Sequence, residues 1–199
     1  MRRNDNTLVA RYLTGWGLAI FFAASAAAFQ PSSGRDGETP RVLPGTGTVQ
    51  AAFTPGDDAG KLITDAIESA HRQILVQAFS FTHRKIADAL IAAQRRGVDV
   101  KVIADKDQIH RIRTSLVSRL ASEGVPVFTD SDHNSAHNKV MVIDAGSPGA
   151  AVITGSYNFT HAAQYKNAEN VLVIRGNAAL IDLYLENWRR HYEHSLPFQ

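Results

Sequence analysis

The chain of 199 residues is 44% hydrophobic and 20% charged, with a formal net charge of +2 and no cysteine. This length fits one domain of ordinary size with additional segments, and the apolar content is sufficient for a packed core. The absence of cysteine excludes a disulfide framework and a thiolate metal site.

The first 28 residues have the features of an export signal. Arginines near the start precede an apolar run that begins at Trp16, and small residues up to Ala28 fit a cleavage site. We expect residues 1–28 to be a signal peptide that directs the protein to the periplasm or out of the cell as a secreted protein. An uncleaved inner-membrane anchor is the alternative, because the apolar regions of signals overlap in length with short membrane spans.

Removal of the signal changes the charge balance. The segment contains Arg2, Arg3, Arg11 and Asp5, so cleavage takes three of the 21 basic and one of the 19 acidic residues and leaves 18 of each. The bulk charge of a neutral mature chain does not indicate a nucleic-acid partner, and any positive field has to be local.

Residues 29–48 are rich in proline, glycine and serine and are expected to be a flexible linker, followed by a folded domain over residues 49–195. Apolar runs predict strands at residues 49–53, 73–79, 98–104, 125–128, 140–143, 151–154 and 170–174. Helical spacing predicts helices over residues 60–70, from a candidate N-cap at Thr82 to Arg96, from Ile109 to Leu120, and from Ile181 to Tyr192. This alternation favours an α/β fold with a mixed or mostly parallel sheet, flanked by helices on both faces.

The most informative segment is the pattern His-x-Lys-x4-Asp, which His137, Lys139 and Asp144 form around the apolar run of residues 140–143. Residues two apart on a strand project to the same face, so His137 and Lys139 are expected side by side if the strand begins before them. A neutral imidazole is a competent nucleophile, and an ammonium beside it binds the non-bridging oxygens of a phosphate.

A second polar group follows in the order Gly155, Ser156, Asn158 and Glu169. Ser156 and Asn158, again two residues apart, can donate hydrogen bonds to the same phosphate. The Glu169 carboxylate can fix the tautomer of a histidine by accepting from its second ring nitrogen. The complete ordered set is much more specific than a lone His-x-Lys pair.

This set resembles the motif of the phospholipase D superfamily, in particular its short, single-motif bacterial endonucleases, and the resemblance extends from about residue 49 onward. It implies a phospholipase D-like fold with one motif half per chain, a phosphohistidine intermediate, and no metal or cofactor. By position it implicates His137 as nucleophile or general acid/base, Lys139 and Asn158 as phosphate ligands, Ser156 as a polar support, and Glu169 as the group that orients His137. Asp144 and Gly155 complete the motif, and the position of Asp144 looks structural rather than catalytic.

The chain departs from the family pattern in one place. Ten residues, 145–154, separate Asp144 from Gly155, which is more than the family usually has. The turn-forming residues 145–150 predict a longer hairpin loop between two strands, and insertions in such loops are usually tolerated.

The resemblance also implies two histidines per site, one that attacks and one that protonates the leaving oxygen. Because the chain contains one copy of the motif, we expect a homodimer with a composite active site on its two-fold axis. The competing hypothesis is that His133 or His161 of the same chain is the acid, although each is more typical of a solvated loop residue.

Four basic residues are weak candidates for substrate-phosphate contacts, because they gather on two predicted helices: Arg84, Lys85, Arg111 and Arg113. Such groups contact backbone phosphates without reading sequence. The alternative is an ordinary solvated helix face. Lys85 also completes a second His-x-Lys with His83, which lacks the residues that follow the main motif.

The resulting hypothesis is an exported, metal-independent phosphodiesterase that most resembles a non-specific endonuclease with nucleic acid as its substrate. The first alternative is a phospholipase D that acts on phospholipid head groups and would share His137, Lys139 and Asn158. The second is an inactive phosphodiester-binding protein, which the intact motif disfavours. A histidine-based metallohydrolase is disfavoured because no predicted helix carries a His-x3-His pair followed by a third ligand.

Overall fold

The computed structural model describes residues 40–199, so the predicted signal peptide and most of the predicted linker lie outside the described residues. The elements in chain order are β1 (Thr48–Thr54), α1 (Ala59–Glu68), β2 (Gln73–Ala78), α2 (Arg84–Arg95), β3 (Asp99–Asp105), α3 (Lys106–Arg111), α4 (Val117–Ser122), β4 (Val127–Asp130), β5 (Lys139–Ile143), β6 (Ala151–Gly155), α5 (His161–Tyr165), β7 (Glu169–Arg175), α6 (Ala178–His194) and β8 (Leu196–Pro197). Within this part of the chain, no helix is both long and apolar enough to span a bilayer.

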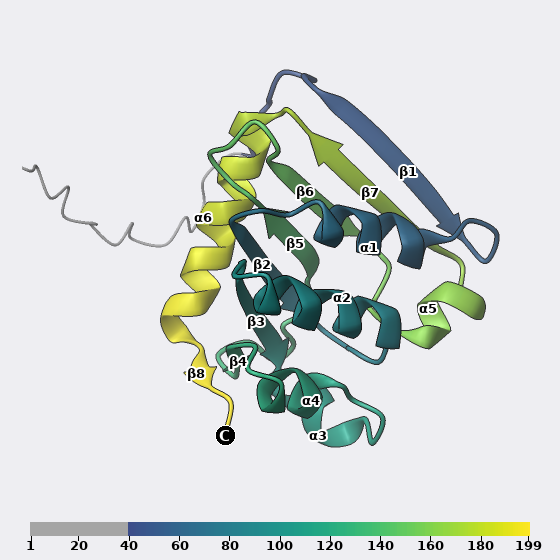
Figure 1. Ribbon diagram of the computed structural model, residues 1–199, viewed down its shortest axis with the longest axis vertical. Helices are drawn as coiled ribbons and strands as arrows, with labels where there is room; N and C mark the ends of the chain where they lie inside the picture. Colours follow the sequence, from purple (N-terminus) through teal and green to yellow (C-terminus); the bar gives the residue numbers. More distant parts are fainter. Residues whose placement is uncertain (1–39) are drawn as a thin grey trace, which may run out of the picture. The chain divides into compact units, whose positions relative to one another are not determined.

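One mixed sheet contains all of these strands, in the order β1-β7-β6-β5-β2-β3-β4-β8 (Figure 1). The neighbours β2, β3 and β4 are parallel and are connected through helices, whereas β5, β6 and β7 form an antiparallel meander. The expected α/β fold with a mixed sheet is therefore confirmed.

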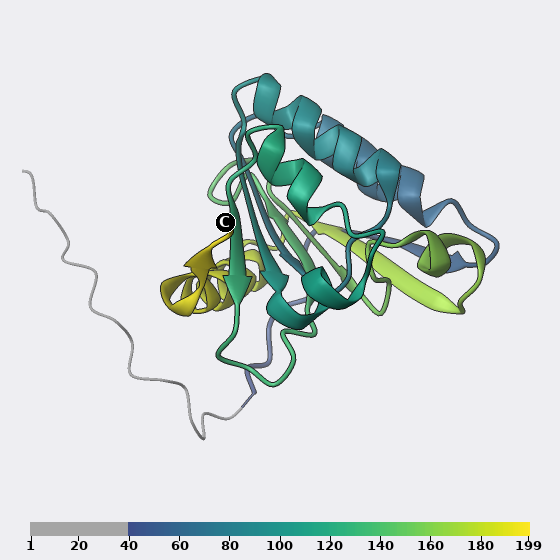
Figure 2. The same cartoon turned by 90° about the horizontal axis from the view of Figure 1, so that it is seen from below.

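Helices cover both faces of the sheet. Figure 2 shows α6 (yellow) on one side and α1 and α2 (blue to teal) on the other. Ile74 and Val76 of β2 point into the core beneath α1 and α2, while Leu75 between them points into the core beneath α6. The α6 helix is held by buried Trp188, whose indole N–H donates to the Val76 carbonyl at 3.1 Å. Truncation of such a buried Trp typically costs about 3–5 kcal/mol.

The predicted third helix is wrong as one continuous element. It divides into α3 and α4, and Ile112 at the break has extended dihedrals (φ −97°, ψ 101°). The backbone N–H of Leu116 donates to the Phe81 carbonyl at 2.9 Å, which ties this segment to the chain that leaves β2. A tertiary contact thus overrides a local helical pattern.

The start of α2 also differs from the prediction. Its N-cap is His83 and not Thr82, and the His83 ring nitrogen Nδ1 accepts from the Ile86 N–H at 3.4 Å. His83 and Lys85, the second His-x-Lys pair, therefore belong to a helix start. The short elements α5 and β8 have no counterpart among the predicted elements.

Candidate active site

The motif residues gather at one edge of the sheet. β5 begins at Lys139, β6 ends at Gly155 and β7 begins at Glu169. Because these strands run antiparallel to their neighbours, all three ends lie at the same edge. Segments up to 32 residues apart in the sequence, from His137 to Glu169, are thereby brought together.

His137 and Lys139 are in contact, although not for the reason expected. The strand begins at Lys139, so His137 lies just before it and is exposed. Lys139 is only 7% exposed. Its Nζ donates to the His137 carbonyl oxygen at 2.7 Å and lies 3.0 Å from His137 Nδ1. The side chain of the lysine folds back along the chain and supports the histidine from beneath.

Phe79, for which the sequence indicated no role, forms a platform for this pair. Its ring lies 4.3 Å from the His137 ring, centroid to centroid, and Lys139 Nζ is 4.8 Å from its centroid. The backbone N–H of Phe79 donates to the Asn138 carbonyl at 2.9 Å, which continues the pairing of β2 with β5. The aromatic contact limits rotation of the imidazole, and the ring face favours the ammonium.

The protonation of Lys139 reflects its burial. Burial lowers the pKa of Lys139 to about 8, and the negative charge of Glu169 opposes part of this decrease. Below that pH the group is an ammonium at the mouth of the site, with its charge available to a phosphate oxygen.

Glu169 lies near Lys139 but does not contact the histidine in the described chain. Its Oε2 accepts from Ser156 Oγ at 2.6 Å and its Oε1 accepts from Asn167 Nδ2 at 2.9 Å. Within residues 40–199 no hydrogen bond joins it to His137, so its expected role in orienting that ring stays a prediction. Ser156 Oγ also accepts from the Asn170 N–H at 3.1 Å, so the serine and the carboxylate form one fixed unit.

Asn158 has an incomplete set of hydrogen bonds. Its Oδ1 is buried and has no hydrogen-bond partner within the described residues. A buried polar atom without a partner is costly and marks a place where a ligand or a rearranged side chain completes the set. Because the two ends of an amide exchange by rotation, the same position can present the Nδ2 donors to a phosphate oxygen.

Asp144 lies at the other end of β5, about 16 Å from Lys139 at the usual rise per residue. Its Oδ1 accepts from the N–H groups of Arg72 and Gln73, and its Oδ2 from that of His71, each at 2.8 Å. Burial alone would raise the pKa of Asp144, but these three donors lower it, and the net pKa is below the ordinary value. The carboxylate joins the turn before β2 to the end of β5, which is a structural role.

Gly155 occupies a place where a side chain would not fit. Its φ is +154°, and a Cβ on it would overlap the carbonyl oxygen of Asn170 in β7. This close approach keeps Ser156 against β7 and beside Glu169.

Three of the four weak phosphate candidates line one pocket. Arg84, Lys85 and Arg113 surround a cavity of about 530 Å³ together with His161. In the described part of the chain, none of these three basic side chains forms an ion pair with a carboxylate. Arg111 does not reach this pocket and pairs with Asp107 at 2.8 Å.

This pocket adjoins the segment after β6 that carries Asn158. The N–H groups of Thr82 and His83 donate to the carbonyl of Phe159, at 2.8 and 2.9 Å. Of the two other candidate acids, His161 lines the pocket and lies against Tyr165 with the two rings tilted, whereas His133 contacts Asp130. Within residues 40–199 neither is hydrogen-bonded to His137.

Known proteins have similar sequences. The family model described as "Cardiolipin synthase, PLD-like domain" matches residues 63–192. A Phospholipase D of Rickettsia bellii is 41% identical over 140 residues, which cover 70% of this chain and 67% of that protein. A Mitochondrial cardiolipin hydrolase of Xenopus laevis is 32% identical over 71% of this chain and 64% of its own length. The chain thus spans about two thirds of these relatives.

Solved structures show the same fold. A phospholipase D family member, Nuc from Salmonella typhimurium, superposes with a TM-score of 0.71 at 36% identity, over 77% of this chain and 99% of its own. NucT from Helicobacter pylori superposes with a TM-score of 0.67 over 76% of this chain and 99% of its own, and at 24% identity it shows the fold alone.

Replacement of Asp144 by alanine tests its structural role. The change leaves three backbone N–H groups without acceptors and is expected to lower the free energy of unfolding in urea by about 2–4 kcal/mol. Because the folded pKa is depressed, the stabilisation exists above the unfolded pKa and disappears as pH falls through the folded pKa, so the difference shrinks in acid. Asp182→Ala, at an exposed position of α6, is the control; equal effects of the two changes would contradict the assignment.

Proposed function

Because the chain belongs to the phospholipase D superfamily and is a hydrolase of phosphodiester bonds, we propose that it is an endonuclease. It cleaves DNA and RNA without a catalytic metal, through a phosphohistidine on His137. The observation that carries the proposal is the exposed imidazole of His137 held 3.0 Å from a buried ammonium and against an aromatic ring. This arrangement presents a nucleophile and a fixed positive charge to the same phosphate.

The proposed reaction has two displacements. In the first, a ring nitrogen of His137 attacks phosphorus, the bond to the leaving oxygen breaks, and a second histidine gives its proton to that oxygen. In the second, the same histidine takes a proton from water, the water oxygen attacks phosphorus, and the phosphorus–nitrogen bond breaks. Lys139 stabilises the charge on the non-bridging oxygens in both steps, and Asn158 donates to one of them.

The tautomer of His137 decides whether its ring can attack. When Lys139 donates to Nδ1, a neutral ring carries its proton on Nε2 and has no lone pair there with which to attack phosphorus. An attacking ring needs an acceptor for its Nδ1 proton, and Glu169 is the proposed acceptor. Two copies of the chain on a two-fold axis would supply one neutral ring as the nucleophile and one imidazolium as the acid.

The proposed substrate follows from local charge. The pocket that contains Arg84, Lys85 and Arg113 offers three cations next to the site edge, which suits a backbone of successive phosphates. The exposed large apolar side chains of residues 40–199 are spread over the segment before β1, β1, α5 and β8: Val42, Val49, Phe53, Tyr165 and Leu196. An enzyme of the lipid surface is expected to gather such side chains on one face.

Phospholipid is the second candidate substrate. It is favoured by the names of the relatives, because the Rickettsia bellii protein is a Phospholipase D and the Xenopus laevis protein is a Mitochondrial cardiolipin hydrolase. The residues that hold the phosphate would be the same, and the two hypotheses differ in what lies beyond it.

Supercoiled plasmid in excess EDTA distinguishes these substrates. The purified protein is expected to nick the plasmid, and His137→Ala to reduce the rate by about 1,000-fold or more, because the nucleophile is lost. His110→Ala, an exposed histidine of α3, is the matched control and should retain activity. Release of head groups from anionic vesicles without nicking would transfer the proposal to phospholipid, and cleavage of neither substrate, both in EDTA and without chelator, would contradict an enzyme at this site.

The pH profile tests the part played by Lys139. Activity that requires the ammonium should decrease as pH rises through about 8, because burial lowers the pKa of Lys139 to about that value. Lys139→Arg should move this limb to higher pH, since a guanidinium keeps its charge. Glu169→Gln removes the opposing charge and should move the limb to lower pH, whatever its effect on the maximal rate. If the decrease in activity occurs at the same pH in both variants, it reflects the titration of another group.

Mixed subunits test the composite site. When wild type and His137→Ala chains are co-expressed in equal amounts, about one quarter of randomly paired dimers contain two intact histidines. Activity per wild-type chain should then decrease by about half, and further with excess variant. Sedimentation should give the mass of a dimer. If the activity per wild-type chain does not depend on the amount of His137→Ala chain, a shared site is contradicted. Co-expression with His110→Ala chains is the control.

A further inference from the structure

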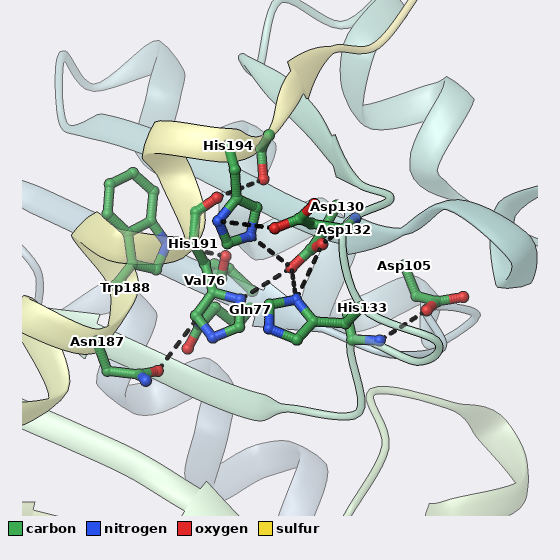
Figure 3. A network of polar contacts seen from close by, with 12 residues as sticks. Val76, Gln77, Asp105, Asp130, Asp132, His133, Asn187, Trp188, His191 and His194 are labelled. Atoms are coloured by element: carbon green, nitrogen blue, oxygen red, sulfur yellow. Dashed lines mark hydrogen bonds and ion pairs between the residues drawn. The ribbon is translucent and has the colours of Figure 1, made fainter. Parts of the chain in front are cut away.

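A second group of titratable side chains lies at the far end of the loop that carries His137. Asp130 ends β4, His133 follows in the loop, and His191 and His194 lie one turn apart at the C-terminal end of α6 (Figure 3). The Asp130 side chain is fully buried. Its Oδ2 is 2.8 Å from His191 Nδ1, 3.1 Å from His133 Nδ1 and 3.2 Å from His194 Nε2.

Hydrogen bonding alone is a poor account of this cluster. One carboxylate oxygen offers two lone pairs, yet three imidazole nitrogens converge on Oδ2 of Asp130. The other oxygen, Oδ1, is also used, because it accepts from the Asp132 N–H at 3.1 Å and lies 3.2 Å from His133 Nδ1. The three rings lie only 4.8 to 5.4 Å apart, centroid to centroid, so their nitrogens converge on one small volume.

The spacing of the atoms fits a cation at their centre. One nitrogen from each histidine and one carboxylate oxygen all lie within 4.8 Å of one another. Ligands at about 2.0–2.1 Å from a tetrahedral ion are about 3.3–3.4 Å apart, slightly more than the three distances from Asp130. To surround the ion, Asp130 Oδ2 would move slightly away from the ring nitrogens, and those nitrogens that lie farther apart, within the 4.8 Å limit, would approach one another.

We propose that Asp130, His133, His191 and His194 bind one divalent transition-metal ion of the zinc type. Three imidazoles with one carboxylate are the donors that such an ion prefers, whereas magnesium and calcium prefer all-oxygen sets. Four protein ligands leave no open position, which is the pattern of a structural site and not of a catalytic one.

The surroundings of His194 support the proposal. Its Nε2 faces Asp130, and its other ring nitrogen, Nδ1, lies 4.0 Å from Asp132 Oδ2. A carboxylate behind a metal-bound histidine fixes the ring and increases its basicity. The His191 carbonyl accepts from Ser195 Oγ at 2.7 Å, which holds the end of α6 in place.

The ion would join the last helix to the loop of the candidate nucleophile. His133 and His137 are four residues apart, and between them the Ala136 N–H donates to Asp105 Oδ2 at 2.8 Å. The ion fixes one end of this loop while the site edge fixes the other. It stabilises the position of His137 without touching the substrate, so the inference does not rest on the proposed function.

The proposed ligands do not form a His-x3-His pair with a third ligand, so their spacing indicated no metal site in the sequence. The actual pattern is Asp-x2-His followed by His-x2-His, with 57 residues between the two. His133, expected to be a solvated loop residue, is exposed but belongs to this cluster. The helical spacing of His191 and His194 was the available signal.

The test uses untagged protein and metal alone. After treatment with chelator and its removal, calorimetry with zinc chloride should give one ion per chain and an increase in Tm, while magnesium should give neither. Cobalt should give the intense visible absorption of a four-coordinate site. Absence of zinc binding, or a cobalt spectrum of an octahedral aqua ion, would overturn the proposal.

Variants locate the ion. The double change His191→Ala, His194→Ala should weaken zinc binding by more than about 100-fold and abolish the cobalt band. His71→Ala, His110→Ala, two exposed histidines outside the cluster, should change neither. Asp130→Asn preserves the shape of the side chain and decides the matter if the double variant does not fold. Unchanged binding in Asp130→Asn, or equal loss in the control pair, would exclude this site.

Discussion

Backbone hydrogen bonds between β5, β6 and β7 fix the register on which the candidate site depends. Met141 pairs with Ile153, and Gly155 pairs with Val171. A slip by one residue would turn Lys139 to the opposite face of the sheet and separate Ser156 from Glu169. The contacts of Asp144 at one end of β5, and of Lys139 with the His137 carbonyl at the other, hold the strand in this position.

Much of the fold and the identity of the motif residues could be predicted, because both depend on local patterns. Strand and helix periods are local, and the spacing from His137 to Glu169 is read directly along the chain. Phe79 could not be found in this way, since its contact with His137 depends on β2 being the neighbour of β5. The break at Ile112 was missed for the same reason, as the contact that causes it reaches Phe81.

The candidate active site and the cluster around Asp130 differ in how far apart their residues lie in the sequence. Lys139 and His137 are two residues apart, so their contact needs only a short stretch of chain. Asp130 and His191 meet only because α6 returns across the sheet to the end of β4. Sequence spacing therefore indicates the pair His137 and Lys139, whereas the contact of Asp130 with His191 depends on the path of the whole chain.

The path between β4 and β5 has a consequence for insertions and deletions. These strands are not neighbours, so residues 131–138 must pass over the ends of β3 and β2, a lateral distance of about 14 Å at the usual strand spacing. Along the way the segment is fixed at Asp105 by Ala136 and at Phe79 by Asn138. These two contacts fix the second half of the segment, so a deletion there would move the imidazole of His137 away from the ring of Phe79. Length variation in this fold is therefore expected in the hairpin loop of residues 145–150, and not here.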